Sequence, residues 1–374
     1  MKVLFIGHYK EGGGWSNASV DFILAMDRCG IDVVCRDIKL TNKVVDVPKR
    51  VLELEKGDAT DCTVCIQHVL PHHIVGSDKF EKNIAYVETE TLSIEPLSWV
   101  EHLKLVDEVW VPNRWMKDDL HLLGIDTKVV NHTHDISKYE KDYPPINIPQ
   151  CDGRFKFYFI GGFDDRKNIE SIIRCFHSEF DKSEQVSLIL KVNRFGMDAN
   201  QLRVHVDQMI SRVKTSLRMY PDIQDYIKDV VISEHATEDN IYALHQHGDC
   251  FIAPSHGEAW SIPAFEAMAF GSTPICSRFG GPTEFIENET REANGKGALI
   301  DGVFSICTSK DAAFPEMFTG REMWFQPCEM QIKNAMRFFY ENRKPDLYKK
   351  QGLEKAKEFS YEKIGSLIKE MLSE

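Results

Sequence analysis

Residues 2–38 read KVLFIGHYKEGGGWSNASVDFILAMDRCGIDVVCRDI. The apolar run 2–7 predicts a buried strand, and a glycine-rich loop follows it. An amphipathic helix is expected from Ala18 to Arg28, and the run 31–38 predicts the next strand. A strand, a helix and a second strand in this order form a β-α-β unit, which predicts a parallel sheet.

The alternation of apolar strands and amphipathic helices continues along the chain. In the first part, further strands are expected at 63–67, 83–87, 108–111 and 128–131. After a proline-rich stretch at 143–153, which is typical of a linker, a second series has strands expected at 155–161, 186–191, 229–233, 249–253 and 273–276. Two such series predict two doubly wound α/β domains. Because ligands bind at the carboxyl ends of parallel strands, we expect a cleft between two facing sheets.

Composition supports a soluble globular protein of two domains. The 374 residues include 45 Lys+Arg and 58 Asp+Glu, a formal net charge of −13, and 43% are hydrophobic. These values exclude a disordered chain and a disulfide-rich miniprotein, and the acidic balance argues against a broad nucleic-acid-binding surface. No apolar run approaches the ~20 residues of a membrane span, and the N-terminus lacks a signal-peptide layout. We expect a cytoplasmic protein, with peripheral membrane association left open.

The cysteines are scattered, and one pair has the spacing of a metal site. Cys62 and Cys65 form the single C-x-x-C, and His68, His72 and His73 follow closely, so zinc is one interpretation. Residues three apart on a strand face opposite ways, however, and this segment is typical of a buried strand. The pattern therefore favours reduced, buried thiols.

The most informative segment, residues 249–287, reads DCFIAPSHGEAWSIPAFEAMAFGSTPICSRFGGPTEFIE. Pro263 suits the first turn of a helix, so a helix is expected to begin at Ser261 or Ile262. The loop before it, 257–261, then presents backbone N–H groups at the positive end of a helix dipole. Such a loop is a ready site for a diphosphate and for sugar hydroxyls.

Two carboxylates frame this predicted helix start. Glu258 lies in the loop and Glu266 about one turn inside the helix, so the two can reach different parts of one ligand. Carboxylates accept hydrogen bonds from hydroxyl groups, as a sugar or a ribose presents them. The alternative is two unrelated carboxylates that the helix dipole favours.

This segment resembles glycosyltransferase family 4, the retaining, nucleotide-sugar-dependent transferases with two Rossmann-like domains in the GT-B architecture. The shared pattern is a pair of glutamates separated by seven residues, followed by Gly280-Gly281-Pro282. The resemblance implies that Glu266 holds the donor ribose and that Glu258 acts near the donor sugar. The other donor-binding residues that it implies are Gly257, Ala259, Trp260 and Ser261.

A second matching segment, residues 159–168, reads FIGGFDDRKN. The resemblance implies that Lys167 neutralises the donor pyrophosphate. Many relatives carry an arginine directly after the first glycine, where this chain has Gly162. The chain resembles a sub-branch with an Arg-Lys-Asn turn, in which Arg166 supplies the second charge for the leaving diphosphate. Gly161 and Lys191 are further donor-side candidates.

The first domain is expected to supply the acceptor side. Gly12, Gly13 and Gly14 permit close approach of a ligand to the backbone. They do not form G-x-G-x-x-G, so a nicotinamide site is poorly supported. The resemblance further implies that Glu88 or Glu90 faces the donor sugar. Weaker candidates are His68, His132 and His134.

The family likeness also implies the domain layout and the chemistry. We expect an N-terminal domain at 1–148, a C-terminal donor domain at 149–356, and a last helix at 357–374 that returns to the first domain. The predicted reaction moves a hexose or pentose from a UDP- or GDP-sugar to an acceptor hydroxyl, with retention and without metal or cofactor.

Several alternatives stay open. The acceptor could be a glycan, a lipid-linked sugar, a protein, a small molecule or a modified nucleic acid base. The basic helix expected at 200–219 is either a solvated face or a contact for an anionic acceptor. Other functions in keeping with two Rossmann-like domains are a sugar-nucleotide epimerase, a phosphorylase-type enzyme, and a non-catalytic nucleotide-sugar-binding protein.

Overall fold

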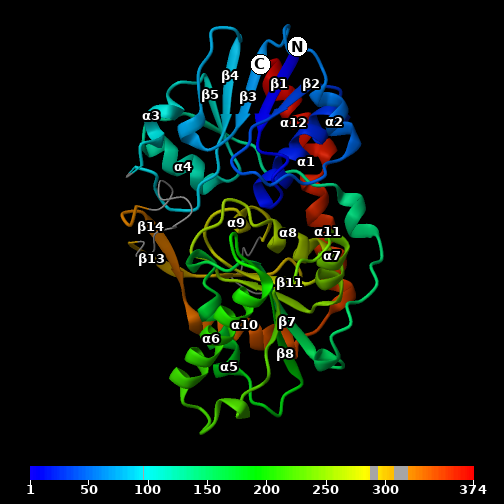
Figure 1. Ribbon diagram of the computed structural model, residues 1–374, viewed down its shortest axis with the longest axis vertical. Coiled ribbons are helices and arrows are strands. Elements are labelled where there is room, and N and C mark those ends of the chain that lie inside the picture. The colour runs from blue at the N-terminus through cyan, green and yellow to red at the C-terminus, as the bar shows by residue number, and fades with distance from the viewer. Residues whose placement is uncertain (96, 287–293, 307–318) are drawn as a thin grey trace. The chain divides into compact units, whose positions relative to one another are not determined.

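The computed structural model describes residues 1–95, 97–286, 294–306 and 319–374, and the chain divides into two compact units (Figure 1). The first unit holds the described residues of 1–138, 306–323 and 357–374. The second unit holds those of 139–305 and 324–356. Each unit is therefore discontinuous in the sequence.

The first unit is built on a six-stranded parallel sheet in the order β2-β1-β3-β4-β5-β6. Its strands are β1 (Lys2–Gly7), β2 (Asp32–Asp37), β3 (Val64–His68), β4 (Lys82–Tyr86), β5 (Glu108–Val111) and β6 (Thr127–Val129). Its α-helices are α1 (Gly14–Arg28), α2 (Lys49–Glu55), α3 (Trp99–Leu103), α4 (Arg114–Leu122) and α12 (Tyr361–Ser373). Parallel neighbours need crossover connections, which the helices α1 to α4 help to provide.

The second unit repeats this plan, with a parallel sheet in the order β12-β11-β10-β7-β8-β9. Its strands are β7 (Phe155–Gly162), β8 (Val186–Asn193), β9 (Val230–Ile232), β10 (Cys250–Ala253), β11 (Thr273–Ser277) and β12 (Ala298–Ile300). Its α-helices are α5 (Ile169–Glu179), α6 (Ala199–Leu217), α7 (Glu238–His247), α8 (Ile262–Phe270), α9 (Pro282–Phe285), α10 (Glu329–Glu341) and α11 (Pro345–Ala356). A separate two-stranded sheet consists of β13 (Gly302–Ile306) and β14 (Met323–Pro327). The predicted pair of doubly wound α/β sheets is confirmed.

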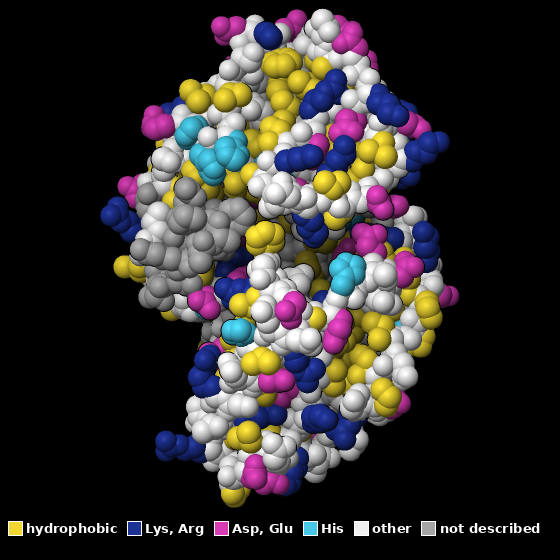
Figure 2. Space-filling model, in the orientation of Figure 1, with side chains coloured by type: hydrophobic (Ala, Val, Ile, Leu, Met, Phe, Trp, Pro, Cys, Tyr) yellow, Lys and Arg dark blue, Asp and Glu magenta, His cyan; other side chains and the backbone are white. Residues whose placement is uncertain are grey.

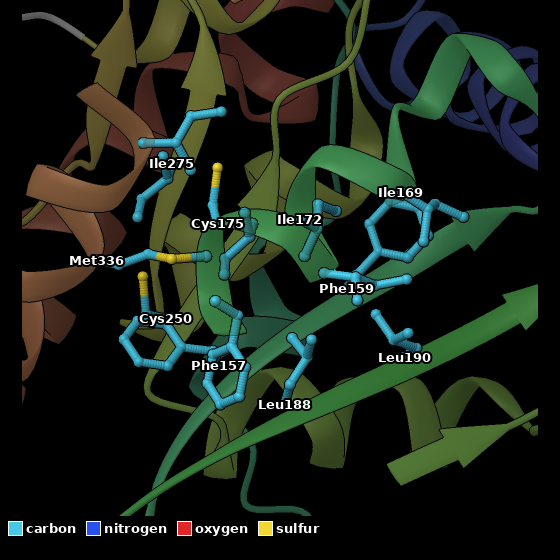
Figure 3. Packing of buried hydrophobic residues seen from close by; sticks show 14 of the residues in the cluster. Phe157, Phe159, Ile169, Ile172, Cys175, Leu188, Leu190, Cys250, Ile275 and Met336 are labelled. Atoms are coloured by element: carbon cyan, nitrogen blue, oxygen red, sulfur yellow. The ribbon is translucent and has the colours of Figure 1, made fainter. Parts of the chain in front are cut away.

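The core of the second unit packs around β7, the strand that leads into the candidate site. Strands β7 and β8 pair over eight residues, from Phe155 with Val186 to Gly162 with Asn193. Every second side chain points to the same face of a strand. On that face Phe157 and Phe159 of β7, with Leu188 and Leu190 of β8, pack among other buried residues such as Ile172 of α5 (Figure 3). Burial of each such side chain contributes about 1.5–3 kcal/mol.

The last helix, α12, packs against α1 within the first unit, and Figure 1 shows the red helix beside the blue one. A Cβ at Gly365 would lie 2.5 Å from the Ala25 carbonyl oxygen, so the close crossing needs a glycine. The Lys369 ammonium donates to the Cys29 carbonyl at 2.9 Å. The predicted return of the C-terminal helix to the first domain is confirmed.

The first helix begins earlier than the sequence indicated. It starts at Gly14 rather than Ala18, and the Asn17 N–H donates to the Gly13 carbonyl at 3.0 Å. Gly13 precedes the helix with φ of 94°, a conformation that favours glycine. Part of the expected glycine loop is therefore the first turn of α1.

The cysteine pair lies in and beside a strand. Cys65 belongs to β3, and Cys62 lies just before it. Both are free thiols that pack with Leu4 and Val34 in one apolar cluster. Burial raises the pKa of Cys65 to about 12, so this thiol stays protonated at neutral pH.

The surface drawn in Figure 2 mixes charges of both signs. Lys and Arg side chains alternate there with Asp and Glu, and no continuous basic area covers the face that is shown. Among the described residues, every helix is too short or too polar to span a lipid bilayer.

Candidate active site

A tight turn after β7 presents two cations. The Asp164 carboxylate accepts the Lys167 N–H at 3.1 Å and so caps a single 3₁₀ turn, Asp165–Lys167. A Cβ at Gly162 would lie 2.7 Å from Asp164 Oδ2, which explains a glycine at the end of the strand. Asn168 closes the turn in the left-handed region with φ of 54°. The turn carries Arg166 and Lys167 at the carboxyl end of β7.

A second loop, between β10 and α8, carries Glu258. Its backbone is fixed by the two glycines that follow β11. A Cβ at Gly280 would lie 2.1 Å from the Glu258 carbonyl oxygen, and the Gly281 N–H donates to that oxygen at 3.0 Å. Ser261, the residue before α8, has a left-handed conformation with φ of 71°. The Gly-Gly-Pro stretch of the sequence therefore supports the loop that holds the first glutamate.

The turn and the loop meet because β7 and β10 are neighbours in the sheet. The Lys167 ammonium lies 2.7 Å from Glu258 Oε1, and Arg166 Nη1 lies 3.3 Å from the same oxygen. Arg166 Nη1 also donates to the Gly257 carbonyl at 2.6 Å. In return, the His256 N–H donates to the Arg166 carbonyl at 2.8 Å. The structure thus brings together Arg166, Lys167, Gly257 and Glu258.

This cluster holds two cations around one carboxylate. Burial alone would raise the pKa of Glu258, but Lys167 and Arg166 outweigh it and hold that pKa at about 2. The carboxylate is therefore ionised at neutral pH, and its side chain is only 9% exposed. Arg166 and Lys167 are the cations of this cluster that an anionic ligand could contact.

Glu266 lies inside α8 and is buried beside a histidine. Its Oε2 is 3.6 Å from His245 Nε2, and His245 Nδ1 lies 2.9 Å from the Tyr158 hydroxyl.

At the start of the same helix, no described group accepts a hydrogen bond from the N–H of Ser261 or Ile262. The N-terminus of α8 therefore has backbone donors to offer to an anion.

Two of the predicted donor-binding residues, Ala259 and Trp260, are buried. Ala259 and Trp260 are 4% and 1% exposed, and the indole packs against Phe265 and Phe285. The Trp260 ring is thus part of the core.

The other donor-side candidates lie at the same edge of the second sheet. Gly161 and Gly162 end β7, and Lys191 pairs with Ile160 on the neighbouring strand β8. The Lys191 ammonium is buried and donates to the Val192 carbonyl at 3.2 Å. Burial lowers the pKa of Lys191, although Glu234 opposes this. Within the described part of the chain the Lys191 ammonium donates to the Val192 carbonyl and not to Glu258, so its side chain would have to turn to reach a phosphate at Lys167.

The first-unit candidates gather at the carboxyl edge of the first sheet. Gly12 and Gly13 have positive φ values of 74° and 94° directly before α1. Glu88 follows β4 and binds two histidines, His68 at 3.0 Å and His132 at 2.9 Å. Glu90 lies two residues further on and is half-buried.

Two of these neighbours were ranked low from the sequence, and others were missed. His68 and His132 were weaker candidates than the glutamates, and Ser19, whose hydroxyl lies 2.8 Å from His68 Nδ1, was not a candidate. His245 beside Glu266 was also missed. The one usable signal was position, because His68 stands at the end of a predicted strand and strand ends carry ligand sites.

The basic helix of the sequence is α6, and most of its cations have partners within the second unit. Arg203 pairs with Asp207 at 2.9 Å, and Arg212 pairs with Glu170 at 2.9 Å. Lys214 is buried and lies 2.6 Å from Asp229 Oδ2. These pairs favour the structural interpretation of that helix over an anionic acceptor contact.

The chain was compared with protein-family models and with curated proteins. Residues 224–348 match the family described as Glycosyl transferases group 1, and this range includes Glu258 and Glu266. A comparison with curated proteins gave no match.

Several solved structures are similar over the whole chain. The Anabaena protein HepE in complex with UDP-glucose has a TM-score of 0.63 and 15% identity, covering 100% of this chain and 99% of that chain. Sucrose-phosphate synthase from Thermosynechococcus elongatus has a TM-score of 0.64 and 13% identity, with 100% and 98% covered. The UDP-forming trehalose-phosphate synthase of Burkholderia xenovorans, in complex with glucose-6-phosphate, has a TM-score of 0.65 and 9% identity, with 100% of both chains covered. At these identities the likeness shows the fold, which is the GT-B architecture of two Rossmann-like domains.

Proposed function

We propose that the protein is a retaining glycosyltransferase that moves a hexose or pentose from a UDP- or GDP-sugar to an acceptor hydroxyl. The observation that carries the proposal is the contact of Lys167 and Arg166 with Glu258 at the carboxyl edge of the second sheet. The match of residues 224–348 to group 1 glycosyl transferases supports the same reaction. The relatives that bind UDP-glucose, or are named UDP-forming, support the donor class.

The donor diphosphate would bind between the turn that carries Arg166 and Lys167 and the N-terminus of α8. Lys167 and Arg166 supply two charges, and the N-terminus of α8 supplies backbone N–H groups. Negative charge grows on the diphosphate as its bond to the sugar breaks, so cations placed there stabilise the transition state more than the ground state. Lys167 and Arg166 are accordingly the residues to which we assign leaving-group stabilisation.

The two glutamates would hold the sugar and the nucleoside. Glu258 accepts hydrogen bonds from hydroxyls of the donor sugar, and Glu266 accepts them from the ribose. The buried loop from Gly257 to Ser261 includes Glu258 and lies before Glu266 in the sequence. Lys191 and the glycines of β7 lie at the carboxyl edge of the second sheet. Gly12 to Gly14, with Glu88 or Glu90, belong in this proposal to the acceptor and donor-sugar side.

Retention follows if the acceptor attacks on the face from which the diphosphate leaves. The bond from the anomeric carbon to the phosphate oxygen breaks, and a bond to the acceptor oxygen forms. The acceptor proton passes to the departing phosphate oxygen, which acts as the base. This step uses only the two substrates and needs no metal or cofactor. Metal independence is therefore part of the proposal.

Acceptor-dependent release of nucleoside diphosphate tests this function. The full chain would be incubated with UDP- and GDP-sugars, with and without a panel of sugar, lipid-linked and small-molecule acceptors. We expect release that requires an acceptor and a product with the anomeric configuration of the donor, observed by NMR. Donor binding without transfer to any acceptor would instead favour a nucleotide-sugar-binding protein, and conversion of the donor alone would favour an epimerase.

A further inference from the structure

Four polar residues outside the donor loop are joined by hydrogen bonds in the first unit. His68 ends β3, Glu88 follows β4 and His132 follows β6, while Ser19 comes from α1. The first three meet because the carboxyl ends of parallel strands lie at one edge of the sheet. His68, His132 and Ser19 are each at most 2% exposed.

The hydrogen bonds impose an order on this cluster. Both imidazoles contact the same atom, Glu88 Oε1. The distance is 3.0 Å from His68 Nε2 and 2.9 Å from His132 Nε2. An imidazole that donates from Nε2 accepts at Nδ1 when it is neutral. The Ser19 hydroxyl lies 2.8 Å from His68 Nδ1 and fits that donor role. The network therefore assigns the Nε2–H tautomer to His68.

Glu88 carries a negative charge in this cluster. Burial lowers the pKa of His68, although Glu88 opposes this, so the imidazole is neutral at neutral pH. Burial would raise the pKa of Glu88, but His132 and His68 outweigh it and hold that pKa at about 2. Among the described side chains, no lysine or arginine pairs with Glu88. Within the described residues, Glu88 is thus an anion whose side-chain partners are two histidines rather than a lysine or an arginine.

Only one oxygen of this carboxylate is used. Oε1 receives both imidazoles, whereas Oε2 has no hydrogen-bond partner among the described residues, and 15% of the Glu88 side chain is exposed. Aromatic rings enclose the histidines: Tyr86 lies 4.9 Å and Trp15 5.6 Å from the His68 ring. Oε2 is not a buried atom, so a ligand can reach it from solvent. The arrangement holds one oxygen and offers the other.

We propose that His68 and His132 are positioning residues that hold Glu88 as a fixed anion, so that the first unit selects a neutral or cationic substrate group over an anionic one. The group that Oε2 receives is a hydrogen-bond donor, a sugar hydroxyl or an ammonium. A carboxylate or phosphate at that position meets a like charge. The inference rests on the proposed function for the nature of the substrate, and it selects Glu88 rather than Glu90.

A double-mutant cycle on the full chain tests the positioning role. Glu88→Ala, His132→Ala and the double variant would be compared by kcat/KM for the donor that gives turnover. His132→Ala should lower kcat/KM about tenfold in the wild-type background and less than twofold in the Glu88→Ala background, because its effect acts through Glu88. Equal losses in both backgrounds would overturn the inference, since a merely structural histidine weakens both proteins alike.

A buried histidine of the second unit supplies the matched control. His177 is 1% exposed and lies 2.8 Å from Asp229 Oδ1, so it resembles His132 in burial and in its carboxylate partner. Any loss that His177→Ala causes should be the same with and without Glu88→Ala. Coupling of His177 with Glu88 as strong as that of His132 would also overturn the inference, because the coupling would then report general destabilisation.

Charge selection is tested with neutral and acidic forms of one sugar. UDP-glucose would be compared with UDP-glucuronic acid as donor-side ligands, and glucose with glucuronic acid as acceptor-side ligands, by Kd. We expect a preference for the neutral form of tenfold or more in one of the two positions, which falls below threefold in Glu88→Gln. An unchanged preference in both positions would refute charge selection by Glu88.

The two proposals fail in different ways. If the wild type turns over and the losses in the double-mutant cycle are additive, the protein is still a glycosyltransferase, but His132 does not act through Glu88. If no donor and acceptor give turnover, the proposed function fails, and the cycle is read on the Kd values of the same ligands. Coupling between Glu88 and His132 in those Kd values would still support the positioning role, and its absence would refute it.

Discussion

The Lys167 ammonium lies 2.7 Å from Glu258 Oε1, although the two residues are 91 positions apart in the chain. The contact arises because neighbouring strands β7 and β10 end at the same edge of the sheet. A donor diphosphate would therefore meet a lysine that already has a carboxylate partner. Binding would require Lys167 to exchange one anion for another, or to hold both together with Arg166.

Lys167→Ala should lower kcat/KM for the donor by about 10- to 100-fold, because a hydrogen bond to a charged group contributes about 1.5–3 kcal/mol. The loss should appear in kcat as well, since the charge on the leaving group is greatest in the transition state. Steady-state release of nucleoside diphosphate measures both. Lys182→Ala removes another ion-paired lysine of the second unit, which pairs with Asp225 at 3.1 Å, and should leave the kinetics unchanged. Wild-type kinetics in Lys167→Ala would show that this turn does not contact the donor.

Glu258→Gln should remove a pH-dependent part of the stability. Burial raises the pKa of Glu258, but Lys167 and Arg166 hold it at about 2, below the value of about 4.3 in an unfolded chain. A carboxyl whose pKa is lower in the folded state stabilises the protein above its unfolded pKa, and this contribution is lost as pH falls toward its folded pKa. The upper limit is about 3 kcal/mol.

Urea unfolding of the wild type and Glu258→Gln at several pH values checks this. The difference in the free energy of unfolding should be largest at pH 6–7 and should shrink as pH falls from about 5 toward 3. A difference that does not change with pH would mean that the Glu258 carboxylate does not owe its ionisation to Lys167 and Arg166.

Gly352→Ala should disturb the helix that carries Glu266. A Cβ at Gly352 of α11 would lie 1.8 Å from the Met268 carbonyl oxygen of α8, so the two helices would have to separate. Overpacking of this kind typically costs about 1–3 kcal/mol. We expect a lower melting temperature together with weaker donor binding. Glu354→Ala, at an exposed position of the same helix, is the control, and equal behaviour of the two variants would contradict the close crossing.

Asp119→Asn should stabilise the first unit at alkaline pH. Burial raises the pKa of Asp119 to about 6. Hydrogen bonds from the Ile94 N–H and the Ser93 hydroxyl favour the charged form and lower this pKa, but burial outweighs them. A carboxyl with a raised folded pKa contributes stability below its unfolded pKa of about 3.9 and loses it as pH rises through about 6. The gain from Asp119→Asn should therefore be larger at pH 8 than at pH 5, on the order of 1 kcal/mol since the group is partly exposed. Asp118→Asn, at the exposed neighbouring position, should show no such dependence.

The sequence was sufficient for the regular elements whose signals are local. The strands predicted at 108–111 and 273–276 match β5 and β11 to within one residue, because buried parallel strands are continuous apolar runs. The strands β12, β13 and β14 were missed. Most residues of β13 and β14 are exposed or only partly buried, so these two strands lack the continuous apolar run of the buried parallel strands. The start of α1 was wrong by four residues, because a helix that begins at a glycine has no capping side chain to mark it.

For the candidate site, the sequence identified the segments but not their contacts. Glu258 and Lys167 stood out through their motifs, and sheet topology then joined them. The tie between Glu88 and His132, 44 residues apart, depends on which strands end side by side. The burial of the Trp260 ring likewise follows from packing against Phe265 and Phe285, which spacing along the chain does not reveal.

The central claim is that the second unit binds a nucleotide-sugar through α8 and the loop before it. Calorimetric titration of the full chain with UDP and with GDP tests this most directly, with wild type and Glu266→Ala compared and the fold of each checked by thermal unfolding. The account predicts that one nucleotide binds with a stoichiometry of about one, and that Glu266→Ala weakens it about 10- to 100-fold, as loss of a charged hydrogen-bond partner requires. Binding of neither nucleotide, or an unchanged Kd in a folded Glu266→Ala variant, would contradict it.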